Sequence, residues 1–191
     1  NTAASQGGCL GESDGSAGAT ATRVDNLSSW IGQNVAEPAA TFREYHGGTT
    51  GIGGFDLADP RDQAVPFDYD HTGKLDHLVM YRPGTGRIWI VKHNANGTFS
   101  AVFSSATGIA GYDLKSDADR IVAFDYDHSG KHDHLLLYRP GAKRVLILKH
   151  GSGTTFTGVY SSTTAGIGGF DVGDPRDQIL AFDYGHTGKL D

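Results

Sequence analysis

Three short stretches of this sequence repeat one acidic phrase whose residue types suit a cation-binding loop. They read FDYDHTGKLDH from Phe67, FDYDHSGKHDH from Phe124 and FDYGHTGKLD from Phe182. Alternate residues of a tight loop can direct oxygen atoms inward, and Ca²⁺ takes six to eight oxygen ligands. When Asp68 is counted as position 1 of the loop, the sixth position is Gly73, which allows a sharp turn. We therefore predict structural calcium sites, with ligands Asp68, Asp70, Thr72, Lys74 (backbone carbonyl) and Asp76 in the first copy, and Asp125, Asp127, Ser129, Lys131 (backbone carbonyl) and Asp133 in the second.

The third copy has a weaker version of the same ligand set. Gly185 replaces the middle aspartate, and the remaining predicted ligands are Asp183, Thr187, Lys189 and Asp191. An alternative interpretation applies to all three copies: the Asp and Thr side chains accept hydrogen bonds from amides of their own loop, as in Asx turns, without a metal.

The phrase belongs to a longer repeat that predicts the fold class. The segment that begins FDLADPRDQ at Phe55 returns at Tyr112, 57 positions later, and again at Phe170, 58 positions after that. Each full copy contains four short apolar runs separated by turn residues, which is typical of β-strands. Four antiparallel strands in such a period are the unit of a β-propeller blade. We therefore predict an all-β propeller built from four-stranded antiparallel blades.

The repeat also sets the predicted boundaries. Residues 51–107 and 108–165 are complete blades, and residues 166–191 supply a first strand and its loop. Residues 20–50 align weakly with the last three strands of a blade, and residues 1–19 form a flexible Gly- and Ser-rich terminus. About three blade equivalents are too few for a propeller of four to eight blades. We expect a second chain, as in a homo-oligomer, or a longer parent chain to complete the ring.

The acidic loop between the first two strands of a 57-residue blade resembles the FG-GAP (VCBS-type) repeats, strongly over residues 50–191 and weakly over residues 20–49. The resemblance implies calcium binding for stability, and ligand binding elsewhere on the propeller. Propellers of this kind occur in the integrin α-subunit, in fungal and bacterial lectins, and as appendages of secreted hydrolases. Thr72 and Ser129 stand where the family usually has Asp or Asn. This difference concerns the calcium affinity of the loops rather than the topology of the blade.

Five further residues are candidates for binding a glycan between blades: Tyr81, Arg82, Trp89, Tyr138 and Arg139. Tyr and Arg recur in the tetrapeptide YRPG, which is a β-turn signature between the second and third strands. In the alternative interpretation the arginine pairs with an acidic residue of a neighbouring blade, such as Asp62 or Asp119, and Trp89 packs in its strand.

Composition excludes several classes of partner. The net charge is −6 without a basic cluster, which argues against nucleic acid as a partner. No apolar run approaches the length of a membrane-spanning helix, so membrane insertion is not expected. The single cysteine, Cys9, excludes an intrachain disulfide framework. The sequons at Asn26 and Asn96 and the family resemblance favour a secreted protein.

Enzymatic activity is not predicted. The nine histidines recur largely at the repeat period, so they are interpreted as parts of the blade rather than as a zinc or catalytic site. The expected function is that of a secreted, calcium-supported, carbohydrate-binding module of the lectin kind. Two alternatives remain: a non-catalytic accessory propeller of a larger secreted hydrolase, such as a phospholipase, and a structural repeat protein that self-assembles.

Overall fold

A computed structural model of the chain describes residue 44 and residues 47–190. The chain divides into two parts, residues 1–44 and residues 45–191, and the account below concerns the second. The predictions for residues 1–19 and for most of residues 20–50 therefore lie outside the described residues, as does Asp191.

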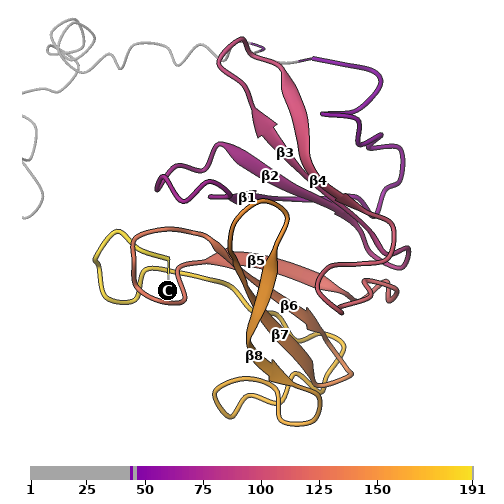
Figure 1. Cartoon of the computed structure of the whole chain (residues 1–191). Helices are drawn as coiled ribbons and strands as arrows, with labels where there is room; N and C mark the ends of the chain where they lie inside the picture. Colours follow the sequence, from indigo (N-terminus) through magenta and orange to yellow (C-terminus); the bar gives the residue numbers. More distant parts are fainter. Residues whose placement is uncertain (1–43, 45–46, 191) are drawn as a thin grey trace, which may run out of the picture. The chain divides into compact units, whose positions relative to one another are not determined.

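Residues 47–190 form β-structure without a helix, as the sequence predicts. They contain two four-stranded antiparallel sheets, which lie one below the other in Figure 1. The first sheet has the strand order β1 (Gln63–Phe67), β2 (His77–Arg82), β3 (Arg87–His93), β4 (Phe99–Ser105). The second has the order β5 (Arg120–Phe124), β6 (His134–Arg139), β7 (Arg144–His150), β8 (Phe156–Ser162). The described residues include no helix of the length and hydropathy that a membrane crossing requires.

The two sheets repeat each other in register as well as in order. Gln63 lies opposite Tyr81 in the first sheet, and Arg120 lies opposite Tyr138 in the second. We call residues 51–107 the first unit, residues 108–165 the second unit and residues 166–190 the third unit.

The YRPG tetrapeptide makes the predicted turn between the second and third strands. The Thr85 amide donates to the Arg82 carbonyl at 3.3 Å, and Gly84 has a φ of 85°. Proline before a glycine of positive φ is the signature of a type II turn. The turn at Arg139 repeats it, with a bond of 3.1 Å from the Ala142 amide.

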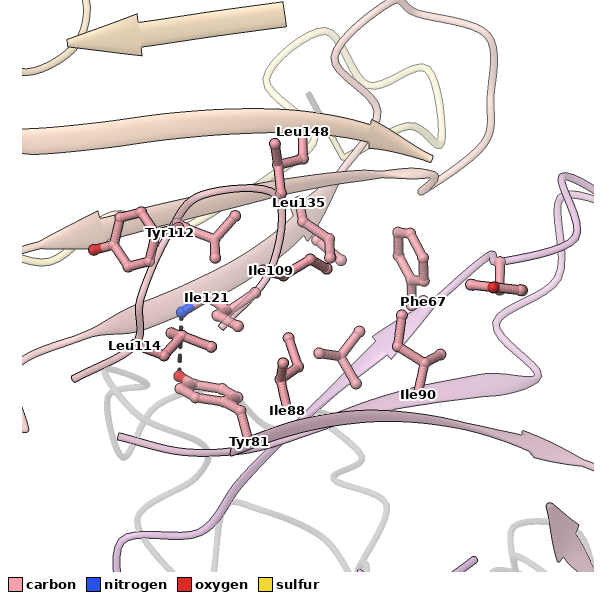
Figure 2. Close-up of a cluster of buried hydrophobic side chains, with 14 residues drawn as sticks. Phe67, Tyr81, Ile88, Ile90, Ile109, Tyr112, Leu114, Ile121, Leu135 and Leu148 are labelled. Atoms are coloured by element: carbon pink, nitrogen blue, oxygen red, sulfur yellow. Dashed lines mark hydrogen bonds between the residues drawn. The ribbon is translucent and has the colours of Figure 1, made fainter. Parts of the chain in front are cut away.

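The largest apolar cluster lies between the two sheets (Figure 2). Phe67 and Ile88 come from the first sheet, and Leu135 and Leu148 from the second; each of these four side chains is fully buried. Burying a side chain of this size contributes about 1.5–3 kcal/mol to stability. The two units therefore share one core.

Tyrosine hydroxyls add directional contacts between successive units. The Ile121 amide at the start of β5 donates to the Tyr81 hydroxyl at 3.1 Å, drawn as the dashed line in Figure 2. The Ile179 amide donates to the Tyr138 hydroxyl at the same distance, 3.1 Å. A buried hydrogen bond of this kind contributes about 0.5–1.5 kcal/mol.

The third unit begins like the other two but does not form the predicted first strand. It keeps the local bridge between Ile167 and Phe170, which corresponds to the bridge between Ile52 and Phe55. Residues 178–184 lie beside no second strand in the described part of the chain, and a strand needs a hydrogen-bonded neighbour. Phe182 and Tyr184 are exposed, at 60% and 81%, whereas the corresponding Phe67 and Tyr69 of the first unit are buried.

Candidate functional site

The first aspartate of each acidic loop closes the loop on itself. Asp68 is fully buried at the end of β1, and its two carboxylate oxygens accept hydrogen bonds from the amides of Thr72 (2.9 Å) and Gly73 (2.7 Å). Asp125 makes the same two contacts in the second unit, and Asp183 makes them in the third. These bonds are those of the Asx-type alternative.

The third and ninth loop positions converge with a residue that lies just after the loop. Carboxylate oxygens of Asp70 and Asp76 and a ring nitrogen of His77 lie within 4.8 Å of one another. In the second unit the corresponding group is Asp127, Asp133 and His134. Asp68 and Asp125 lie outside these groups. Each group has the donor types of a metal site, and nothing in it identifies calcium.

The remaining predicted ligands have other contacts or stay predictions. The Thr72 hydroxyl donates to Asp70 Oδ1 at 3.0 Å, and the Ser129 hydroxyl donates to Asp125 Oδ1 at 3.3 Å. The carbonyls of Lys74 and Lys131 remain predicted ligands. In the third unit the Lys189 ammonium donates to the His128 carbonyl.

His77 and His134, which the repeat period assigned to the blade rather than to a metal site, are functional candidates in the structure. Each is 1% exposed, and Nδ1 of each lies 2.7 Å from Oδ1 of the preceding aspartate. These nitrogen and oxygen atoms are buried, and none of them has a partner in hydrogen-bond geometry. The signal in the sequence is the Asp-His pair that ends the loop in both complete copies.

A lysine from the third strand of each sheet lies against the middle aspartate. Lys92 Nζ is 3.1 Å from Asp70 Oδ2, and Lys149 Nζ is 2.5 Å from Asp127 Oδ2. The hydrogen bond from Lys149 is the main reason why the pKa of Asp127 is well below its usual range. An incoming cation must therefore compete with an ammonium group at this carboxylate.

The first two loops are joined across the unit boundary. The Asp68 amide donates to the His132 carbonyl at 3.0 Å. His71 extends from the first loop to the second, where its Nδ1 lies 2.7 Å from Asp133 Oδ2 and its Nε2 lies 2.9 Å from the Gly151 carbonyl oxygen. Burial alone would lower the pKa of His71, but the Gly151 carbonyl and the Asp133 carboxylate outweigh it, and the pKa is raised.

The arginines predicted to contact a glycan hold the turn regions of their own units. The Arg82 guanidinium donates to both carboxylate oxygens of Asp62, at 2.7 and 2.9 Å. Arg139 makes the equivalent pair with Asp119, at 2.8 and 3.0 Å. The alternative interpretation named these acidic partners correctly, but it was wrong to place them in a neighbouring blade. Arg61, in contrast, does cross between units, and it donates to Asp117 at 2.8 Å.

Trp89 packs edge-on against Phe55, with ring centroids 6.4 Å apart and an interplanar angle of 76°. Its role as a glycan contact stays a prediction.

Tyr81 and Tyr138 line a cavity of about 340 Å³ where the three units meet. Gln63, Arg120 and Gln178, which occupy the same position in the three copies, also line it. The cavity thus combines two guanidinium groups (Arg120 and Arg176), one carboxylate (Asp177) and two amides with buried tyrosines. Pockets of this size, with mixed polar and apolar walls, are the usual form of small-ligand sites.

Comparisons with known proteins add no family to this description. No protein-family model matches the chain, and neither the curated proteins nor the solved structures include a match. The residues and their geometry therefore carry the functional argument.

Proposed function

We propose that this chain is a β-propeller binding module, that its ligand is a carbohydrate, and that its acidic loops hold a structural cation. The observation that carries the binding proposal is the cavity where Gln63, Arg120 and Gln178, which are equivalent residues of the three units, converge. The residue pattern of the acidic loops supports the structural cation, and the family resemblance supports the propeller assignment.

The chemistry of the cavity suits a hydroxyl-rich ligand. Gln63 and Gln178 each offer an amide donor and an amide acceptor, and Arg120 offers donors only. Arg120 Nη1 donates to the carbonyls of Asp117 and Asp119, both at 2.9 Å, which fixes the guanidinium at the wall. Val65, Ile121 and Ile179 contribute apolar atoms to the lining. Such a combination can bind both the hydroxyl groups and the C–H face of a sugar ring.

Glycan-array binding followed by calorimetric titration with the best sugar tests this proposal. We expect the Arg120→Gln variant to weaken sugar binding by about tenfold or more, since hydrogen bonds to charged groups contribute about 1.5–3 kcal/mol. Arg87→Gln is the matched control, because Arg87 pairs with Asp56 and does not line the cavity. The proposal is wrong if no glycan binds, or if both variants bind it like the parent chain.

We propose further that a second copy of the chain completes the ring. The exposed side chains of Leu180, Phe182 and Tyr184 support this proposal, since their counterparts in the first unit, Val65, Phe67 and Tyr69, are more buried. In this proposal, residues 178–184 of one chain pair with residues 20–50 of the second chain, whose sequence aligns weakly with the last three strands of a blade. The same exposed segment is also what favours the self-assembling structural protein as a second candidate function.

Mass in solution distinguishes these assemblies. A closed ring of two chains is expected to give one species of twice the chain mass over a wide range of protein concentrations, because burying the exposed apolar segment favours association. An open series of larger species would instead support the structural candidate. A monomer at micromolar concentrations would contradict both.

A further inference from the structure

The donor atoms that converge in the two complete loops differ from those that a calcium loop supplies. A hard ion such as Ca²⁺ takes oxygen ligands. In the first unit the converging atoms are two carboxylate oxygens and one imidazole nitrogen, from Asp70, Asp76 and His77. Asp68, which the calcium pattern places first, lies outside the group and uses its oxygens to hold loop amides.

The buried contact between Asp76 and His77 has the donor atoms and the geometry that a bound cation satisfies. Asp76 Oδ1 and His77 Nδ1 lie 2.7 Å apart, yet they do not have the geometry of a hydrogen bond. Leaving a buried polar atom without a partner costs about 1–3 kcal/mol. A metal ion bound to both atoms satisfies both of them at once.

The second unit repeats this contact independently. Asp133 Oδ1 and His134 Nδ1 are also 2.7 Å apart, buried and outside hydrogen-bond geometry. Asp133 Oδ2 contacts His71 Nδ1, so a residue of the first unit orients this carboxylate. Such outer contacts are a usual feature of metal sites, where they fix the orientation of the ligands.

We propose that Asp70, Asp76 and His77 form one site, and Asp127, Asp133 and His134 a second, for a divalent transition metal ion such as Zn²⁺ or Mn²⁺ in preference to Ca²⁺. Imidazole and carboxylate together suit these ions, whereas Ca²⁺ disfavours nitrogen. The inference rests on the cation-holding part of the proposed function and changes the ion. It also revises the interpretation of His77 and His134 as residues of the blade alone.

The lysines at the sites set the expected affinity. Lys92 and Lys149 contact the Asp70 and Asp127 carboxylates and must move when a cation binds there. Replacing both with glutamine removes this competition, so we expect the Lys92→Gln/Lys149→Gln variant to bind Zn²⁺ more tightly, by about tenfold. Weaker binding by this variant would contradict the proposed position of the ion.

The decisive experiment is calorimetric titration of the full, metal-free chain with Zn²⁺, Mn²⁺ and Ca²⁺ in separate runs. We expect two Zn²⁺ ions per chain, bound at least tenfold more tightly than Ca²⁺. The His77→Asn/His134→Asn variant is expected to lose at least tenfold in Zn²⁺ affinity and to leave Ca²⁺ binding unchanged. His132→Leu is the matched control, because His132 lies outside both groups and the first copy has Leu75 at that position.

Tighter binding of Ca²⁺ than of Zn²⁺ would overturn the proposal, as would unchanged Zn²⁺ binding by the double histidine variant. If that variant does not fold, electron spin-echo modulation of Mn²⁺ bound to the native chain gives the answer. Coupling to an imidazole nitrogen supports the site, and its absence contradicts it. Sugar binding is read out separately at the Arg120 cavity, so failure of the metal proposal and failure of the binding proposal are distinguishable.

Discussion

Replacing Arg139 with methionine is expected to lower the free energy of unfolding by about 3–5 kcal/mol. The cause is Asp119, which is 0% exposed and receives two hydrogen bonds from the Arg139 guanidinium, at 2.8 and 3.0 Å. The Tyr112 hydroxyl and the Ser116 amide also donate to Asp119, both at 2.9 Å, but neither carries a positive charge. Removing one partner of a buried ion pair leaves the other charge uncompensated, and losses of this size result.

Urea denaturation followed by circular dichroism measures this loss, and Arg176→Met provides the matched control. Arg176 pairs with Asp174 at 2.8 Å, but its side chain is 89% exposed. Exposed pairs contribute about 0–1 kcal/mol, so the control variant is expected to remain within that range of the parent chain. Asp119→Leu combined with Arg139→Met should recover part of the lost stability, because no charge is then buried alone. Similar losses for Arg139→Met and Arg176→Met would contradict the argument.

Replacing Gly108 with alanine is the second change for which a large effect is expected, a loss of more than about 3 kcal/mol in the free energy of unfolding. Gly108 has a φ of +88°, and a Cβ atom added to it would lie 1.8 Å from the Tyr112 carbonyl oxygen. A left-handed conformation alone costs an L-residue about 1–2 kcal/mol. The overlap with backbone adds to this cost, since Tyr112 is tied to Ile109 by two hydrogen bonds of 2.8 and 2.9 Å.

Gly111, three residues further along the same connection, separates the two contributions. Its φ is +84°, but an added Cβ meets no atom within 4 Å. Gly111→Ala is therefore expected to cost only the backbone term of about 1–2 kcal/mol. Thermal and urea unfolding of the two variants give the comparison. Equal losses would mean that the overlap with the Tyr112 carbonyl adds nothing to the destabilisation.

Much of the described fold could be predicted from the sequence because its signals are local. Short apolar runs between turn residues mark all eight strands, and the YRPG tetrapeptide fixes the turn after Arg82 and after Arg139. The absence of the predicted strand at residues 178–184 has a physical reason. This segment has nearly the composition of β5, but strand formation depends on a neighbour that the described residues do not supply.

The candidate metal loops were predictable in position but not in geometry. The spacing of Asp70 and Asp76 indicates correctly that their carboxylates converge. Spacing alone does not reveal that Asp68 is held by two loop amides, nor that the buried His77 points its Nδ1 at Asp76. These features depend on how β2 enters the core, which is a tertiary property. The same holds for the cavity, whose lining is contributed by three units.

The tyrosine contacts between units have a consequence for how such a chain can lengthen. Tyr81 accepts from the Ile121 amide, and Tyr138 accepts from the Ile179 amide, so every complete copy carries the acceptor for the copy that follows it. The contact is head-to-tail, with different surfaces on its two sides. A gene segment duplicated in tandem therefore brings its own docking contact with it. New copies need no new interface, and unmatched faces remain only at the two ends of the array.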